Sequence, residues 1–169
     1  MGRLFDAVAA LLGVCARTSY EAQAAIELEM AATGKLGIGD RASGNSATFR
    51  HYPFQIQPSD NTYTIRLGEM LDTLVDEIGS GVPVDEMAVR FHQAVARMTV
   101  EVCDRIARDT GLRTVALSGG CFQNRLLLAL TLPALQASGF QVLHHRQVPC
   151  NDGGLSLGQA AIAHFAAKS

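Results

Sequence analysis

Residues 113–145, RTVALSGGCFQNRLLLALTLPALQASGFQVLHH, change their hydrophobic pattern twice and decide the fold class. A strand-like run at 113–118 leads through two glycines into a helix-like segment at 121–137, and a second strand-like run follows at 140–145. A loop then leads to a last predicted helix at about 153–167. This alternation of strand and helix favours a parallel pair of strands in an α/β layer.

Two strand-to-helix turns in this region carry paired glycines, SGG at 118–120 and NDGG at 151–154. Ligands of open α/β sheets sit beyond the carboxyl ends of the strands, so parallel neighbours would bring both turns to one rim. Glycine lets a ligand approach the backbone, and the N-terminus of the following helix favours an anion. The turn could therefore bind a phosphate or a nucleotide. An ordinary tight turn without a ligand is an equal alternative.

Three side chains in these turns could carry chemistry. The Asn124 amide could reach a sugar or a base, although capping the helix is the commoner role for this residue type. Asp152 would most simply cap the last helix, and it could instead be a carboxylate ligand to a divalent metal, with further ligands from elsewhere. Cys121 begins a helix, but nothing nearby supplies an obvious base, so we do not expect a nucleophile.

The five histidines form no metal-binding spacing of the H-x-x-x-H kind. His144 and His145 are adjacent, so on a strand they would point to opposite faces. We expect all five to be structural or exposed. His92 is the open case, because it sits beside Phe91 on a long predicted helix and could face the core or a cleft.

Upstream of residue 113 the pattern is helical apart from one hairpin. A stripe from Met87 to Ile106, with apolar residues at steps of three and four, predicts the buried face of a long helix, and Ser19 is the expected N-cap of an earlier one. The predicted elements are helices at 3–13, 20–33, 67–79 and 84–109, a glycine-rich loop at 34–48, and strands at 49–57 and 61–67 joined by a turn at 58–61.

Composition narrows the function classes. The 169 residues suit one domain or two small lobes, and the net charge of −2 without a basic block gives no support for nucleic-acid binding. The apolar runs are too short to span a membrane, and no signal-peptide layout is visible, so we expect a cytoplasmic protein. Four cysteines without a C-x-x-C pair predict free thiols. The abrupt start in a helix-like segment hints at a piece of a longer protein.

Four stretches together resemble the C-terminal end of HypF-type carbamoyltransferases, which are hydrogenase maturation factors. The stretches are GRLFDAVAALLG (2–13), SYEAQAAIELE (19–29), VALSGGCFQNRLLL (115–128) and HRQVPCNDGGLSLGQAAIA (145–163). The resemblance implies an α/β fold, the helix-rich C-terminal lobe of an actin-like (ASKHA, RNase H-like) ATPase domain with a small sheet. The single lobe 1–169 would comprise a helical segment and loop at 1–48, a hairpin and long helices at 49–111, and a nucleotide and metal part at 112–169.

The resemblance also implies an activity. Enzymes of this family make carbamoyl-adenylate from carbamoyl phosphate and ATP, and pass the carbamoyl group to the C-terminal cysteine of a HypE-type acceptor in [NiFe] hydrogenase maturation. An O-carbamoyltransferase of secondary metabolism, or a non-catalytic lobe that binds nucleotide or a partner, are the alternatives. The family's metal histidines would come from a motif that this sequence lacks, so we expect the isolated chain to be inactive or nearly so.

Site roles follow from the resemblance, position by position. Two positions depart from the family pattern, Cys121 and Cys150, and neither inherits a role. The implied roles are Asp152 as the metal-ligand and catalytic carboxylate, Gly119 and Gly120 near the nucleotide phosphates, Asn124 on the nucleoside, Asp6 on the sugar, and Ser19, Glu21 and Gln23 flanking the nucleotide.

Overall fold

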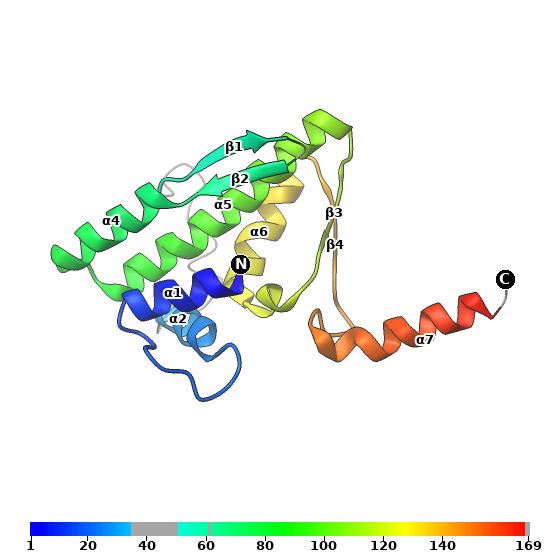
Figure 1. Cartoon of the computed structure of the whole chain (residues 1–169), viewed down its shortest axis with the longest axis horizontal. Coiled ribbons are helices and arrows are strands. Elements are labelled where there is room, and N and C mark those ends of the chain that lie inside the picture. Colours follow the sequence, from blue (N-terminus) through cyan, green and yellow to red (C-terminus); the bar gives the residue numbers. More distant parts are fainter. Residues whose placement is uncertain (35–50, 61, 168–169) are drawn as a thin grey trace.

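The computed structural model describes residues 1–34, 51–60 and 62–167, and its helices other than the last gather around one long central helix (Figure 1). That helix, α5 (Val84–Thr110), contacts α2 (Gln23–Thr33) and α6 (Arg125–Ala137), while α1 (Gly2–Leu11) packs on α2. The predicted helices at 3–13 and 84–109 are therefore confirmed. The loop predicted at 34–48 lies outside the described residues apart from its first position.

The predicted stripe of α5 is buried over its first part only. Met87, Phe91, Val95 and Met98 lie in the main core, whereas Ile106 is 41% exposed, so the prediction was wrong at that end. The reason is a second, smaller apolar cluster beneath the α/β layer, which buries Ala107 on a different face of the helix.

The predicted hairpin is present, but with a tighter turn than expected. Strands β1 (Gln55–Ser59) and β2 (Thr62–Arg66) pair antiparallel, with Ser59 opposite Thr62, so Pro58 and Ser59 belong to the strand rather than to the turn. The first strand also begins later than predicted. The described residues before it do not pair; among them Tyr52 is buried, and its hydroxyl donates to Glu77 of the following helix α4 (Gly68–Gly79) at 2.6 Å.

The C-terminal third forms the parallel pair that the sequence predicted. Strands β3 (Thr114–Leu117) and β4 (Gln141–His144) run parallel, with Thr114 opposite Gln141, and α6 connects them. The predicted helix at 121–137 is split, because a short 3-10 helix, η1 (Gly120–Gln123), precedes α6 and Asn124 between them has an extended backbone.

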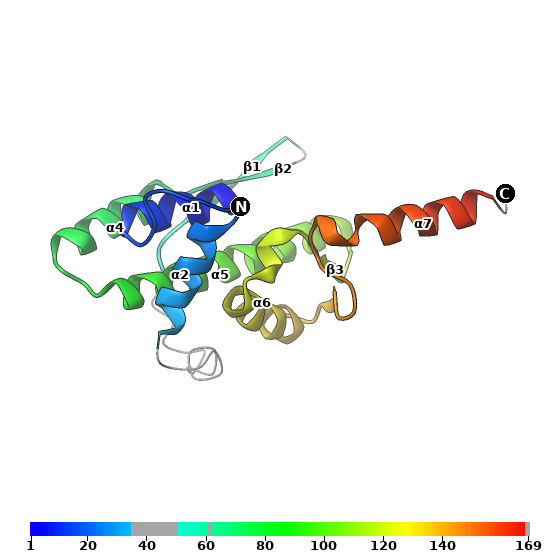
Figure 2. The same ribbon diagram turned by 90° about the horizontal axis from the view of Figure 1, so that it is seen from below.

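The last helix extends away from the packed body in both views (Figures 1 and 2). A second 3-10 turn, η2 (Asp152–Gly154), leads into α7 (Leu155–Ala166), whose residues are all exposed. Within the described ranges, no helix is both long and apolar enough to cross a membrane.

The start of α2 differs from the prediction. Ser19 does not cap the helix, which begins at Gln23 after Ala22 in the left-handed conformation (φ 62°). Instead the backbone N–H and the hydroxyl of Ser19 both donate to Gln23 Oε1, at 2.7 and 3.0 Å. Ser19 therefore lies before the N-cap position, and the Gln23 side chain fixes the turn that precedes the helix.

Candidate functional site

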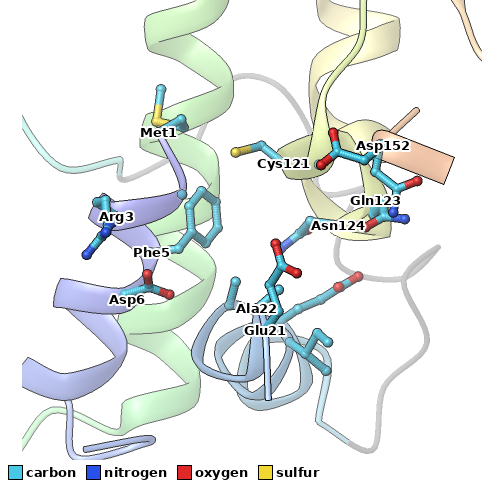
Figure 3. A pocket seen from close by; sticks show the side chains of 16 residues that line it. Met1, Arg3, Phe5, Asp6, Glu21, Ala22, Cys121, Gln123, Asn124 and Asp152 are labelled. Atoms are coloured by element: carbon cyan, nitrogen blue, oxygen red, sulfur yellow. The ribbon is translucent and has the colours of Figure 1, made fainter. Parts of the chain in front are cut away.

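A cavity of about 940 Å³ lies between α1, the start of α2, and the two turns η1 and η2 (Figure 3). Segments far apart in the sequence meet there, and five predicted site residues line it: Asp6, Glu21, Gly120, Asn124 and Asp152. Of the described residues with predicted roles, Ser19, Gln23 and Gly119 do not line the cavity. Most, though not all, of the predicted site residues therefore lie in one pocket.

The two glycine turns share one rim, as the parallel strand pair predicted. The N–H of Gly119 donates to the carbonyl of Cys150 at 2.8 Å, and Ser118 Oγ lies 3.0 Å from His145 Nε2. Gly119 has φ 94°, a conformation that disfavours side chains, so its first role is to shape the turn.

The expected anion site at the N-terminus of α6 is already filled by the protein. Glu29 of α2 accepts hydrogen bonds from the backbone N–H of Arg125 at 2.8 Å and of Leu126 at 3.1 Å. A carboxylate is a favourable group at this end of the helix dipole, so the prediction that α6 offers free N–H groups to a phosphate was wrong. Glu29 and Arg125 are 96 positions apart, and no local pattern marks the pair.

Backbone donors remain one step earlier, in η1. Within the described part of the chain, the N–H groups of Gly120 and Cys121 donate no hydrogen bond. Both residues line the cavity. These two N–H groups, rather than the α6 terminus, are the place where an anionic oxygen would be stabilised.

Asn124 both caps α6 and lines the cavity. Its Oδ1 accepts from the N–H of Leu127 at 2.7 Å, so the capping alternative is confirmed, while one side of the residue still faces the pocket. Its Nδ2 lies 2.9 Å from Nε2 of His92, a fully buried histidine of α5. Sequence reasoning left His92 open between core and cleft. It lies in the core and supports the wall of the cleft.

The charge on the cavity wall is mainly negative. Among its described lining residues are the carboxylates of Asp6, Glu21, Glu29 and Asp152, against the single guanidinium of Arg3. Figure 3 shows Glu21 reaching into the pocket on the side of Asn124, with Asp6 on the opposite α1 wall. Such a wall suits hydroxyl and amino donors of a ligand, and it suits phosphate only near the η1 donors or beside a cation.

Asp152 does not cap the last helix. Its neighbour Asn151 does the capping in η2, where Oδ1 accepts from Gly153 N–H at 3.1 Å, and the Asp152 carboxylate is exposed on the cavity wall. Glycine is needed at position 154 for packing within the chain, because a Cβ there would lie 2.9 Å from the carbonyl oxygen of Pro149.

The described residues do not complete a metal site. Over residues 1–34, 51–60 and 62–167, no three His, Cys, Asp or Glu side chains come together as a ligand set. Asp152 is a suitable oxygen donor for a hard divalent cation, but it is only one donor. All four cysteines are free, as predicted.

Gln23 lies outside the cavity lining, and its side chain makes hydrogen bonds within the chain. Its Oε1 holds the Ser19 turn, and its Nε2 donates to Glu27 at 2.7 Å, so the polar atoms of its side chain are engaged within the chain. Ala22, in the strained left-handed conformation, lies on the cavity wall next to Glu21.

Comparison with known proteins gives one consistent result. Residues 1–159 match the family described as Carbamoyltransferase, Kae1-like Domain, second subdomain. A carbamoyltransferase HypF homolog of Cupriavidus necator is 41% identical over 96% of this chain and 39% of its own length. Carbamoyltransferase HypF of Synechocystis is 33% identical over 94% of this chain and 18% of its own length. The chain thus spans less than half of these curated relatives.

A solved structure matches the whole chain. The crystal structure of full-length HypF in the phosphate- and nucleotide-bound form superposes with a TM-score of 0.83 and 37% identity, covering 100% of this chain and 25% of that one. Together with the helix-rich body and small parallel sheet, this match confirms the predicted fold class, a lobe of an actin-like domain.

Proposed function

The chain belongs to the family of the second subdomain of the carbamoyltransferase Kae1-like domain, and we propose that its cavity holds the nucleotide half of carbamoyl-adenylate. The observation that carries the proposal is the convergence of Asp6, Glu21, Gly120, Asn124 and Asp152, from four separate segments, on one cavity. The solved relative whose description includes a bound phosphate and nucleotide supports it.

Each wall of the cavity would meet a different part of the nucleotide. Asp6 on α1 would accept hydrogen bonds from the sugar hydroxyls, and Asn124 would contact the nucleoside. The N–H groups of Gly120 and Cys121 would stabilise a phosphate oxygen. Glu21 would contact the nucleotide at the α2 side.

Three predicted residues would act without lining the cavity. Gly119 would allow the turn that presents the η1 donors, and Gln23 with Ser19 would hold the turn that carries Glu21. We propose these as positioning roles: for Gly119, whose family counterpart lies near the phosphates, and for Ser19 and Gln23, whose counterparts flank the nucleotide.

The reaction of the whole protein would be carbamoyl transfer from carbamoyl-adenylate, made from carbamoyl phosphate and ATP, to the C-terminal cysteine of a HypE-type acceptor. The acceptor sulfur would attack the carbamoyl carbon and AMP would leave. This chain would contribute by holding AMP in place, so that orientation and charge stabilisation supply its share of the rate.

Asp152 would be one carboxylate ligand of a divalent metal whose remaining ligands lie outside the described residues. Bound there, a metal would neutralise phosphate charge near a wall that is otherwise acidic. Because Asp152 alone does not hold a metal, we expect the 169-residue chain by itself to transfer no carbamoyl group to a HypE-type protein. Full transfer by the chain alone would contradict that expectation.

Isothermal titration of the chain with ATP tests the proposed site. We expect Asp6→Asn to weaken binding by about tenfold, because one charge-assisted hydrogen bond to the sugar is lost. Asp72→Asn, an exposed change on α4, is the matched control and should bind as the wild type does. Equal affinity of the wild type and Asp6→Asn would refute the site.

A further inference from the structure

His92 lies behind the cavity wall rather than in it, and it is fully buried. We propose that His92 is a positioning residue of the nucleotide site, which fixes the Asn124 amide in one of its two possible orientations through a single imidazole tautomer. The proposal rests on the proposed function in one respect, namely that Asn124 contacts the nucleotide.

The tautomer follows from the partner on the far side of the ring. His92 Nδ1 lies 2.8 Å from the carbonyl oxygen of Ala88. A carbonyl only accepts hydrogen bonds, so Nδ1 must carry the proton. In the neutral ring the other nitrogen, Nε2, is then an acceptor, and burial keeps the ring neutral by lowering its pKa to about 4.

The orientation of the amide follows from the tautomer. Because Nε2 accepts, the Asn124 atom 2.9 Å away must be the amide nitrogen. The amide oxygen then points to the N–H of Leu127, where it caps α6 at 2.7 Å. If the amide were flipped, its oxygen would face the acceptor Nε2 of His92 and its NH2 group would face the N–H of Leu127. Both hydrogen bonds would then be lost. The observed orientation is therefore favoured by roughly a hundredfold.

Two phenylalanine rings pack against the His92 ring and hold it in place. It makes edge contacts with Phe91 of α5 and with Phe5 of α1, at ring-centre distances of 5.9 and 5.3 Å. Phe5 itself lines the cavity. His92 therefore connects the α1 wall, which carries Asp6, with the η1 wall, which carries Asn124.

Asn124 has defined groups left for a ligand. One amide N–H goes to His92 and one oxygen lone pair goes to Leu127, which leaves one N–H and one lone pair. Without the acceptor at His92, the amide could turn and exchange these groups, and a ligand matched to one orientation would meet the other.

Nuclear magnetic resonance on the chain tests the tautomer without any ligand. The 15N shifts of the His92 ring should show a protonated Nδ1 and an unprotonated Nε2 at neutral pH. Asn124→Asp keeps a good capping group but places an acceptor opposite Nε2, so both ring nitrogens should then be protonated. A protonated Nε2 in the wild type, or ring shifts unchanged in Asn124→Asp, would overturn the proposal.

A double-mutant cycle tests whether His92 acts through Asn124. We expect His92→Phe, which keeps an aromatic ring at this position but removes both ring nitrogens, to weaken ATP binding by about tenfold. We expect the same change to have no further effect in an Asn124→Ala background, whereas a merely structural role would weaken both backgrounds equally.

The two hypotheses fail in different ways. If the wild-type chain binds no ATP, the proposed function fails for this chain, and the ring shifts of the wild type and of Asn124→Asp still decide the tautomer. If the wild type binds ATP and His92→Phe binds it equally well, the positioning role fails while the nucleotide site stands.

Discussion

Acid should destabilise this chain through one side chain, His92, whose contribution can be isolated. Burial lowers the pKa of the ring from 6.5 in the unfolded chain to about 4 in the folded chain. Between these values the unfolded chain binds a proton that the folded chain does not. The free energy of unfolding is therefore unaffected by protonation of this residue well above pH 6.5, and it falls as the pH drops from 6.5 toward about 4.

The size of the effect follows from the two pKa values. One pKa unit corresponds to about 1.4 kcal/mol, so at about pH 4.5 the free energy of unfolding should be lower by roughly 2–3 kcal/mol on account of this residue alone. In the described part of the chain, the ring contacts the Ala88 carbonyl, the Asn124 amide and the rings of Phe5 and Phe91, groups that do not titrate in this range.

Urea unfolding followed by circular dichroism measures this contribution. We compare the wild type with His92→Phe at pH 7 and at about pH 4.5, because protonation of the carboxylates affects both proteins and cancels in the difference. The wild type should lose roughly 2–3 kcal/mol more than the variant between the two pH values. An equal loss in the two proteins would refute a buried neutral His92.

Three further substitutions test the local geometry by the same unfolding assay. Glu29→Ala should lower the free energy of unfolding by about 1–2 kcal/mol, because two N–H groups of α6 lose their acceptor. Ala22→Gly should raise it by about 1 kcal/mol, because only glycine tolerates φ 62° without a steric cost. Gly154→Ala should lower it by at least 1 kcal/mol, since the new Cβ would lie 2.9 Å from the carbonyl oxygen of Pro149.

Each of these changes has a matched control. Glu29→Gln keeps an acceptor oxygen and should retain most of the stability. Ala25→Gly, inside α2, should cost about 1 kcal/mol, and Gly158→Ala, with open space around it in α7, should be neutral or stabilising. The geometry would be contradicted if Ala22→Gly lowered the free energy of unfolding as much as Ala25→Gly does. It would also be contradicted if Glu29→Gln cost as much stability as Glu29→Ala. The same holds if alanine were tolerated equally well at Gly154 and Gly158.

The parts of the fold that the sequence predicted are those with local signals. Apolar periodicity located α5, and the alternation of strand and helix located the parallel pair β3–β4, whose shared rim then follows from topology. The motif at 118–124 pointed to a turn with a ligand-facing edge, and Gly120 and Asn124 do line the cavity.

What the sequence did not reveal depends on contacts between distant residues. The Glu29 carboxylate reaches α6 across 96 positions, and His92 meets Asn124 across 32, so neither pair leaves a local pattern. The Ser19 prediction failed because the helix begins later, at Gln23 after a left-handed Ala22, so Ser19 precedes the N-cap position and donates to the Gln23 side chain instead. A buried polar residue such as His92 on an apolar helix face is itself a signal, since it requires a partner, but it does not identify the partner.

We propose above that a nucleotide binds in the cavity between α1, α2 and the two glycine turns. The most direct measurement is a titration of the 15N-labelled chain with ATP, followed through the backbone amide signals. We expect the signals of Gly120, Cys121, Asn124 and Ala22 to shift together with ATP concentration, while those of the exposed helix α7 stay in place. Absence of shifts at millimolar ATP, or shifts confined to residues away from the cavity, would contradict it.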